Sequence, residues 1–336
     1  MIVTLTLNPS LDRTVEVEAL RRGTMVRTTT PVLEPGGKGV NVARALTANG
    51  IPALAIVTVA GPEGAELSRL LERDGVLCRF VPVSGRTRSN LTVCEPDGTV
   101  TKLNEPGCPF EEADVAQVLT AIRTGVRDGD WFVLSGSTPP GLAEGHLSAI
   151  LAGAAASGAH LVVDTSGPAL ATALDARPRL IKPNLAELAE LSGREPSTIA
   201  EVRDAAESVR ARGPEYVLVS MGADGAMLVG PDGMLLGESR VDRPRSTVGA
   251  GDSFLAGFLS RFSQDESDVE AALLEALDWG AAATRLPGSA VPSPSDLDPE
   301  SVRLVWQPDP DRPLVASEQS ATVPELPVRR STQQNV

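Results

Sequence analysis

One short stretch of the chain places flexible backbone and a carboxylate where they could do chemistry together. Residues 247–256 read Thr-Val-Gly-Ala-Gly-Asp-Ser-Phe-Leu-Ala, and the apolar end of this run is typical of a helix. Gly249 and Gly251 let bare backbone approach a ligand, and the free N–H groups that begin a helix favour an anion. Asp252 beside that anion could remove a proton from a hydroxyl while the amides stabilise charge on a phosphoryl group. This combination is typical of a kinase.

A second glycine cluster leads into another expected helix, at residues 40–49. It reads Gly36-Gly37-Lys38-Gly39, with Asn41 one turn into the helix. The glycines permit close approach, Lys38 supplies a cation, and Asn41 can both donate and accept hydrogen bonds. A phosphorylated, polyhydroxylated ligand would use all three. The alternative is an ordinary helix start with a glycine turn.

Polar side chains also follow several expected strands, and in open α/β sheets ligands bind beyond the carboxyl ends of strands. Each has a structural alternative: a turn cap, an edge-strand charge, a βα loop, a helix capping box or a simple hairpin turn. For Glu187 the functional alternative is a contact through water to Mg²⁺, which keeps several waters. The residues are Asp12, Arg88, Ser135-Gly136-Ser137, Asn184, Glu187 and the stretch Ser220–Ala226.

Short β-branched runs alternate with Ala- and Leu-rich helical stretches, which predicts a parallel sheet covered on both faces. We expect strands at 2–7, 53–59, 131–135, 160–164, 180–182 and 216–220. We expect helices at 40–49, 64–74, 113–124, 147–157, 186–191, 199–212 and 252–263.

Two segments, 13–33 and 88–103, look like strands without crossover helices. The second contains Pro96-Asp97-Gly98, a hairpin turn. Such added strands could form a lid over the site or an ordinary surface hairpin, and the pattern fits both.

Composition narrows the class of protein. The 336 residues carry a formal net charge of −14 and no basic stripe, which argues against binding to nucleic acid. The three cysteines lack metal-ligand spacing, which indicates free thiols in a reducing compartment. No apolar run reaches the roughly 18 residues of a membrane-spanning helix, and the start of the chain looks like a strand rather than a signal peptide. We therefore expect a cytoplasmic protein without a membrane partner.

Residues 306–336, rich in Pro, Ser, Thr, Gln and Glu, are predicted to be a disordered tail.

Taken together, these motifs resemble the ribokinase-like carbohydrate kinases, in particular the phosphofructokinase B branch. The two signatures of that branch are matched by residues 36–43 and 246–253, and the resemblance covers about residues 1–297. In detail the chain is most similar to the 1-phosphofructokinase and tagatose-6-phosphate kinase groups. Supporting stretches are 8–12, 87–90, 135–137, 182–187 and 220–222.

The resemblance implies an α/β fold. A central, mostly parallel sheet of about eight or nine strands would be flanked by helices and carry a small β-sheet lid. The kinase domain would span residues 1–305, with the lid built from about 13–33 and 88–103. Lids of this family often pair, so a homodimer is expected.

The resemblance also implies roles on the phosphoryl-transfer side, with ATP and Mg²⁺ as cofactors. Asp252 would be the base, and Gly249, Ala250 and Gly251 would form the anion hole. Glu187 would serve the metal. The residues expected beside the nucleotide are Asn184, Ser220, Gly222 and Gly225.

On the sugar side, Lys38 and Arg88 would neutralise a phosphate already present on the acceptor. The residues expected to face the sugar are Asp12, Gly37, Asn41 and Ser137. Lys38 is typical of the 1-phosphofructokinase and tagatose-6-phosphate kinase groups, whereas Arg27 points slightly toward 6-phosphofructokinases.

The sequence therefore favours an enzyme that phosphorylates fructose 1-phosphate. The alternatives are a 6-phosphofructokinase or a tagatose-6-phosphate kinase. A non-catalytic sugar-phosphate binding protein is disfavoured because Asp252 is present, and a nucleoside kinase because its acceptor would leave Lys38 and Arg88 without a phosphate.

Overall fold

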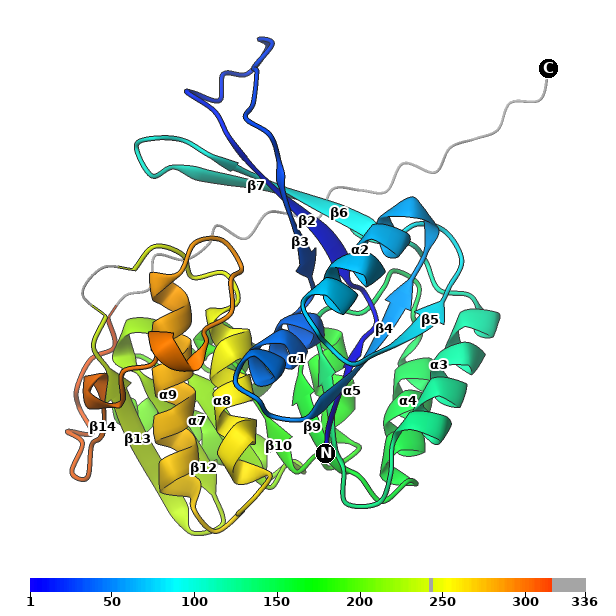
Figure 1. Ribbon diagram of the computed structural model, residues 1–336. Helices are drawn as coiled ribbons and strands as arrows, with labels where there is room; N and C mark the ends of the chain where they lie inside the picture. The colour runs from blue at the N-terminus through cyan, green and yellow to red at the C-terminus, as the bar shows by residue number, and fades with distance from the viewer. Residues whose placement is uncertain (242–243, 316–336) are drawn as a thin grey trace.

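A ten-stranded sheet runs through the centre of the protein in the order β14-β13-β12-β11-β10-β9-β8-β1-β4-β5 (Figure 1). This computed structural model describes residues 1–241 and 244–315. The seven strands from β5 to β11 pair in parallel, and β12, β13 and β14 add an antiparallel edge. The strands are β1 (Ile2–Thr6), β4 (Ala53–Val59), β5 (Cys78–Pro82), β8 (Trp131–Ser135), β9 (His160–Asp164), β10 (Leu180–Ile181), β11 (Tyr216–Ser220), β12 (Ala226–Gly230), β13 (Gly233–Ser239) and β14 (Val302–Leu304).

Helices cover both faces of this sheet, as the alternation of strands and helices predicted (Figure 1). Neighbouring residues of β1 show the two faces: Ile2 packs in the core under α1, α8 and α9, whereas Val3 packs in the core under α3, α4 and α7. The helices are α1 (Lys38–Ala48), α2 (Gly61–Arg73), α3 (Glu112–Gly125), α4 (Glu144–Ala155), α5 (Pro168–Leu174), α6 (Leu185–Ser192), α7 (Ile199–Arg210), α8 (Ala250–Phe262) and α9 (Val269–Arg285). None of them, within the residues described, is long and apolar enough to cross a membrane.

The central elements agree with the sequence, but several at the periphery were not expected. The 17-residue helix α9 packs along α8. It is capped by Asp268, the residue before its first turn, whose carboxylate accepts a hydrogen bond from Ala271 N. The short helix α5, the edge strand β5 and the antiparallel strands β12 to β14 were also missed. The predicted count of eight or nine strands is therefore too low.

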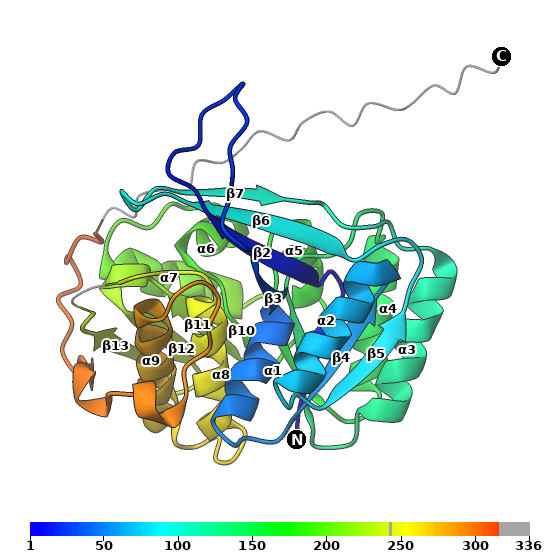
Figure 2. The same ribbon diagram turned by 45° about the horizontal axis from the view of Figure 1, so that its top comes forward.

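A second sheet of four strands, in the order β3-β2-β6-β7, stands over the carboxyl ends of the parallel strands (Figures 1 and 2). We call it the lid sheet. The predicted turn at 96–98 joins β6 and β7, because Glu95 N donates to Thr99 O and Gly98 N to Glu95 O. The prediction for 13–33 is right only at its ends, since residues 17–31 contain no strand. The strands are β2 (Ser10–Glu16), β3 (Val32–Gly36), β6 (Arg88–Cys94) and β7 (Val100–Asn104).

The chain beyond β14 differs from the expected disordered tail. Residues 306–315 lie against the start of α7, where Leu314 N donates to Ser197 O at 2.9 Å and Ile199 N donates to Arg312 O at 3.2 Å. Leu314 also packs on the main core. The part of the predicted tail from 316 to 336 lies outside the described residues.

Candidate active site

The start of α8 forms one wall of the candidate site. Gly249 precedes the helix with a φ of 74°, a left-handed conformation that favours glycine. Within the described residues, Gly251 N donates to no carbonyl, as expected for the first turn of a helix. Ala250 N has only a long bond of 3.4 Å to Thr247 O. The predicted anion hole at Gly249, Ala250 and Gly251 therefore has amides available for a ligand.

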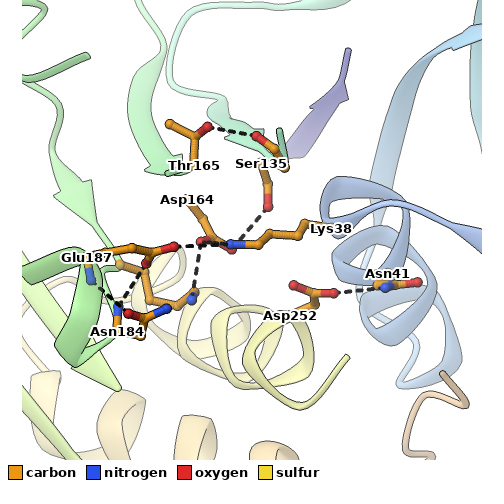
Figure 3. Close-up of polar contacts among 10 residues, drawn as sticks. Lys38, Asn41, Ser135, Asp164, Thr165, Asn184, Glu187 and Asp252 are labelled. Atoms are coloured by element: carbon orange, nitrogen blue, oxygen red, sulfur yellow. Dashed lines mark hydrogen bonds and ion pairs between the residues drawn. The ribbon is translucent and has the colours of Figure 1, made fainter. Parts of the chain in front are cut away.

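Asp252 lies buried in the first turn of α8, with 7% of its surface exposed. Its Oδ2 accepts a hydrogen bond from Nδ2 of Asn41 at 2.8 Å, although the two residues are 211 positions apart in sequence (Figure 3). Burial, and then the negative charge of Asp164, raise the pKa of Asp252 to about 6, against the opposing effects of Asn41, Lys38 and Lys182. A carboxylate with such a pKa suits a general base that acts near neutral pH.

Asp164, at the end of β9, is the central charge of the site and is completely buried. Its Oδ1 lies 2.9 Å from Nζ of Lys38 and 3.3 Å from Nζ of Lys182, and its Oδ2 accepts a hydrogen bond from Ser135 Oγ at 3.2 Å (Figure 3). Burial by itself would raise the pKa of Asp164, but the two lysines lower it. The cluster is thus an ionised carboxylate shared by two ammonium groups.

Asp164 and Lys182 were not among the predicted site residues. Both stand at the carboxyl ends of expected strands, the same signal that pointed to Ser137 and Asn184. Applied to these strand ends as well, that rule would have found them.

Lys182 connects the charge cluster to the start of α8. The side chain is buried, and a Cβ atom placed on Gly251 would lie 3.6 Å from its Nζ. A buried cation beside free helix amides strengthens the attraction for an anion, because both act in a region that excludes water.

Asn184 and Glu187 form the capping box that the sequence offered as their structural alternative. Asn184 Oδ1 accepts from Glu187 N and Glu187 Oε2 accepts from Asn184 N, both at 2.9 Å. The other carboxylate oxygen of Glu187, Oε1, lies 4.0 Å from Nζ of Lys38. Glu187 therefore keeps one oxygen directed at the charge cluster while it caps α6.

The turn after β11 lies next to this cap. Ser220 pairs with Asn184 in an isolated parallel bridge, and the turn continues as a single 3-10 turn over Gly222–Asp224. Gly225 has a φ of 89°, and a Cβ atom there would lie 2.1 Å from Gly237 O on β13. The residues predicted for the nucleotide side are thus brought together at one end of the sheet.

Asp12 lies on the strand β2 of the lid sheet rather than in a turn. Its Oδ1 accepts hydrogen bonds from Ser10 Oγ at 2.7 Å and from Asn90 Nδ2 at 2.9 Å. A Cβ atom on Gly36, on the neighbouring strand β3, would lie 2.4 Å from Asp12 Oδ2. The lid sheet therefore fixes the position of this carboxylate.

Ser137 and Gly37 lie near the same end of β1. Ser137 is exposed, and its Oγ accepts a hydrogen bond from Asn8 Nδ2 at 3.2 Å. Gly37 has a φ of 119°, and a Cβ there would lie 2.9 Å from Cγ2 of Thr6. Only glycine therefore fits at the turn that begins α1.

The two cations predicted to hold the sugar phosphate have different partners. Arg88 donates from Nε to Asn8 O at 3.2 Å and from Nη1 to Glu105 O at 3.1 Å, while burial lowers its pKa. Lys38 instead reaches Asp164 and Glu187, and its pKa is raised because their charges and that of Asp252 outweigh the effect of burial. In this conformation Lys38 belongs to the cluster around Asp164, and Arg88 to the base of the lid sheet.

An α/β fold with a carboxylate and free amides at a helix start, opposite a cluster of cations, defines a phosphotransferase that acts on a hydroxyl group. Comparison with known sequences identifies the class of phosphotransferase, because residues 5–296 match the pfkB family of carbohydrate kinases. The chain belongs to this family of carbohydrate kinases.

Similar proteins of known sequence and structure agree. The chain is 38% identical to a 1-phosphofructokinase of Haloferax volcanii over 85% of this chain and 93% of the relative. It is 34% identical to the ATP-dependent 6-phosphofructokinase isozyme 2 of Escherichia coli over 88% of this chain and 96% of the relative. The crystal structure of Escherichia coli phosphofructokinase-2 with fructose-6-phosphate superimposes with a TM-score of 0.82 at 33% identity, covering 88% of this chain and 96% of that one.

Proposed function

We propose that this protein transfers a phosphoryl group from ATP to the 6-hydroxyl of fructose 1-phosphate, giving fructose 1,6-bisphosphate and ADP. The observation that carries the reaction is Asp252, a buried carboxylate with a pKa near 6 beside the free amides of α8. The substrate is supported by the relatives of similar sequence that are 1-phosphofructokinases, at 33–38% identity.

In this mechanism Asp252 accepts the proton of the acceptor hydroxyl, and Asn41 orients the carboxylate through the hydrogen bond to Oδ2. The amides of Gly249, Ala250 and Gly251, together with Lys182, stabilise the negative charge of the transferred group. Positioning and charge stabilisation supply most of the catalysis in phosphoryl transfer, so no covalent intermediate on the protein is needed.

Mg²⁺ would be held mainly by the phosphates of ATP. Among residues 1–241 and 244–315 no cluster of three metal-ligating side chains occurs, which suits an ion bound through one carboxylate, waters and phosphates. Oε1 of Glu187 is the oxygen available for that contact, and the ion would offset phosphate charge. Asn184, Ser220, Gly222 and Gly225 would line the nucleotide side.

The acceptor would lie between α1 and the lid sheet. Asp12, Gly37, Asn41 and Ser137 would contact its hydroxyls, and Arg88 its phosphate. Arg88 now donates to two carbonyl oxygens, so a bound phosphate would have to replace or share these bonds. Lys38 would reach the acceptor phosphate only by leaving Asp164.

The position of Lys38 is the observation that favours the alternative substrate, fructose 6-phosphate. This lysine is typical of the 1-phosphofructokinase and tagatose-6-phosphate kinase groups, but here it pairs with Asp164. Arg27, on the segment between β2 and β3, and the 34% identity to a 6-phosphofructokinase support the same alternative. Tagatose 6-phosphate is the third candidate.

An assay of ADP release with fructose 1-phosphate, fructose 6-phosphate and tagatose 6-phosphate tests the assignment. We expect the highest kcat/KM with fructose 1-phosphate. Equal or higher kcat/KM with either 6-phosphate would overturn the substrate assignment. If none of the three sugar phosphates led to ADP release, the proposal that this protein is a sugar-phosphate kinase would be wrong.

The proposal includes a homodimer through the lid sheet and a cytoplasmic location. Apolar side chains on the lid sheet support the dimer, because Val32, Val100 and Leu103 are each more than half exposed. Free thiols at Cys78, Cys94 and Cys108 support the location.

A further inference from the structure

Residues 306–315, which we call the strap, lie outside the part of the chain that matches the kinase family. The strap follows β14 and runs along the β13–β14 edge of the central sheet, at the red end of the coloured ribbon (Figures 1 and 2). None of the roles described above uses it.

The strap is joined to the protein by backbone hydrogen bonds at the start of α7. Ile199 N and Ala200 N donate to Arg312 O and Pro310 O at 3.2 and 3.0 Å, and Leu314 N donates to Ser197 O at 2.9 Å. The first amides of a helix have no partner within the helix, so the strap supplies acceptors that α7 lacks. The strap is therefore part of the folded domain.

The strap also forms hydrogen bonds with the turn that follows β11. Asp224, in that turn, is only 3% exposed and its Oδ2 accepts a hydrogen bond from Val315 N at 2.8 Å. Arg312 donates from Nη2 to Asp224 O at 3.4 Å and from Nη1 to Oε1 of Glu238 on β13 at 3.0 Å. One guanidinium thus links the turn to the neighbouring strand.

This turn leads directly to the nucleotide side of the site. Met221 N donates to Gly225 O at 2.9 Å and closes the turn, while Ser220 bridges to Asn184. Asn184 in turn holds Glu187 through the capping box. A change in the conformation of the turn would therefore shift the residues proposed to face ATP.

We infer that the strap holds the turn at 222–225 in the conformation that binds the nucleotide, with Arg312 and Asp224 as positioning residues. The inference rests on the proposed role of this turn in ATP binding. A binding site that is competent for only part of the time has an apparent affinity lower by that fraction. Loosening the turn would thus weaken ATP binding without changing the sugar side.

The test compares full-length Arg312→Ala with Arg303→Ala. Arg303 also pairs with Glu238, at 2.8 Å, and none of its hydrogen bonds or ion pairs involves Asp224, so it serves as a matched control. Titration calorimetry with a non-hydrolysable ATP analogue measures nucleotide affinity, and the assay gives KM for each substrate. We expect Arg312→Ala to weaken the analogue about tenfold and leave the sugar-phosphate KM unchanged. Arg303→Ala should bind the analogue as the wild type does, and Arg312→Lys should restore part of the affinity.

Equal losses of analogue affinity in Arg312→Ala and Arg303→Ala would overturn the inference, as would a lower Tm of Arg312→Ala with unchanged affinity. Either outcome would show that the strap contributes to packing and stability but does not position the nucleotide-binding turn. Failure of the proposed function would give a different result. The wild type would bind the ATP analogue but phosphorylate no sugar phosphate, while Arg312→Ala would still bind the analogue more weakly than the wild type. A wild type that does not bind the analogue would overturn both.

Discussion

At the scale of single residues, the role proposed for Asp252 carries a cost in stability. The folded protein raises its pKa from 3.8 to about 6, so the native state holds the proton more tightly than the unfolded chain does. Stability therefore falls as the pH rises from about 4 to about 6, because the ionised carboxylate is buried. At neutral pH this difference corresponds to about 3 kcal/mol.

Replacing Asp252 with Asn separates the two effects. We expect Asp252→Asn to lower kcat by at least ~10²-fold, because an amide cannot accept the hydroxyl proton. The same variant should have a higher Tm at neutral pH, since the buried charge is gone. Thermal unfolding and the ADP-release assay provide the measurements.

Asp278→Asn is the matched control. Asp278 is also a buried carboxylate, on α9, and burial raises its pKa. Among the described residues, the one hydrogen bond that its side chain accepts comes from Asp298 N. The control should keep its turnover. Retained turnover in Asp252→Asn would remove Asp252 from the role of base.

The pH dependence of kcat/KM provides a second prediction at this scale. Activity should fall as the pH drops through about 6, since Asp252 must be ionised to accept a proton. The phosphate of the substrate also titrates near pH 6, so the acid limb alone does not identify the group. Asn41→Ala, which removes the hydrogen bond that stabilises the carboxylate, should move the limb to higher pH by roughly one unit. An acid limb that stays in place in Asn41→Ala would assign it to the substrate.

At the scale of elements, the lid sheet places a carboxylate over the end of the central sheet. In the β2–β3 pair Gly36 lies opposite Ser10, two residues before Asp12. The missing Cβ at Gly36 leaves room for the Asp12 side chain. Because β2 follows β1 after only three residues, the lid sheet and the base of the site share one continuous stretch of chain. Small changes in the lid should therefore alter acceptor binding first.

Gly36→Ala tests this arrangement. A Cβ atom at 2.4 Å from Asp12 Oδ2 and 2.5 Å from Ser10 Oγ forces Asp12 to move. We expect KM for the sugar phosphate to rise about tenfold or more, with KM for ATP unchanged. Gly145→Ala, at an exposed position of α4 with no atom within 4 Å of the added Cβ, is the control and should match the wild type. Equal increases in both KM values would contradict a role confined to the acceptor.

At the scale of the whole molecule, the lid sheet projects beyond the main body (Figure 1). Its Val32, Val100 and Leu103 side chains are more than half exposed. A small sheet with free edges and exposed Val and Leu residues is typical of a surface that pairs with another copy. Such pairing would place one lid against the other and restrain both over their sites.

Leu103→Glu, on the edge strand β7, tests the dimer. Leu103 is 57% exposed, and a charge there would be buried without a partner if two lids pair. We expect this variant to sediment as a monomer at concentrations where the wild type is a dimer. Leu77→Glu changes an equally exposed leucine just before β5, outside the lid sheet, and should remain dimeric. A wild-type chain that sediments as a monomer would overturn the proposal.

Features that depend on nearby residues could be predicted from the sequence. The glycines around Asp252, the helix from 252, the turn at 96–98 and the parallel strands at the centre of the sheet all follow from local conformation and periodicity. The α/β fold was predicted on this basis. The family, the sugar kinase class and the small second sheet were predicted instead from the resemblance of the motifs to known kinases. Comparison with known proteins confirms the family and the class, and the structure contains the second sheet.

Pairings across the fold could not be predicted, because they depend on strand order and helix packing. Residues 41 and 252 meet only because α1 and α8 pack side by side on the same face of the sheet. Lys38 was predicted to bind a sugar phosphate, yet it pairs with the buried Asp164 at the end of β9. This pair forms because α1, which begins with Lys38, packs against β1 and β8, and β9 is the next strand of the sheet. The polar composition of 306–315 indicated disorder, but the unpaired amides of α7 and the carboxylates of Asp224 and Glu238 gave these residues partners.

The sequence by itself determined the chemistry that we propose, because the proposed base, the proposed anion hole and their glycines occupy one short stretch whose conformation is local. Only the tertiary structure decided the electrostatics of that chemistry. The pKa of Asp252 reflects burial and the charges of Asp164, Lys38 and Lys182, which come from distant parts of the chain. Coulomb interactions depend on distance in space and on exclusion of water, and neither is written in the order of the residues.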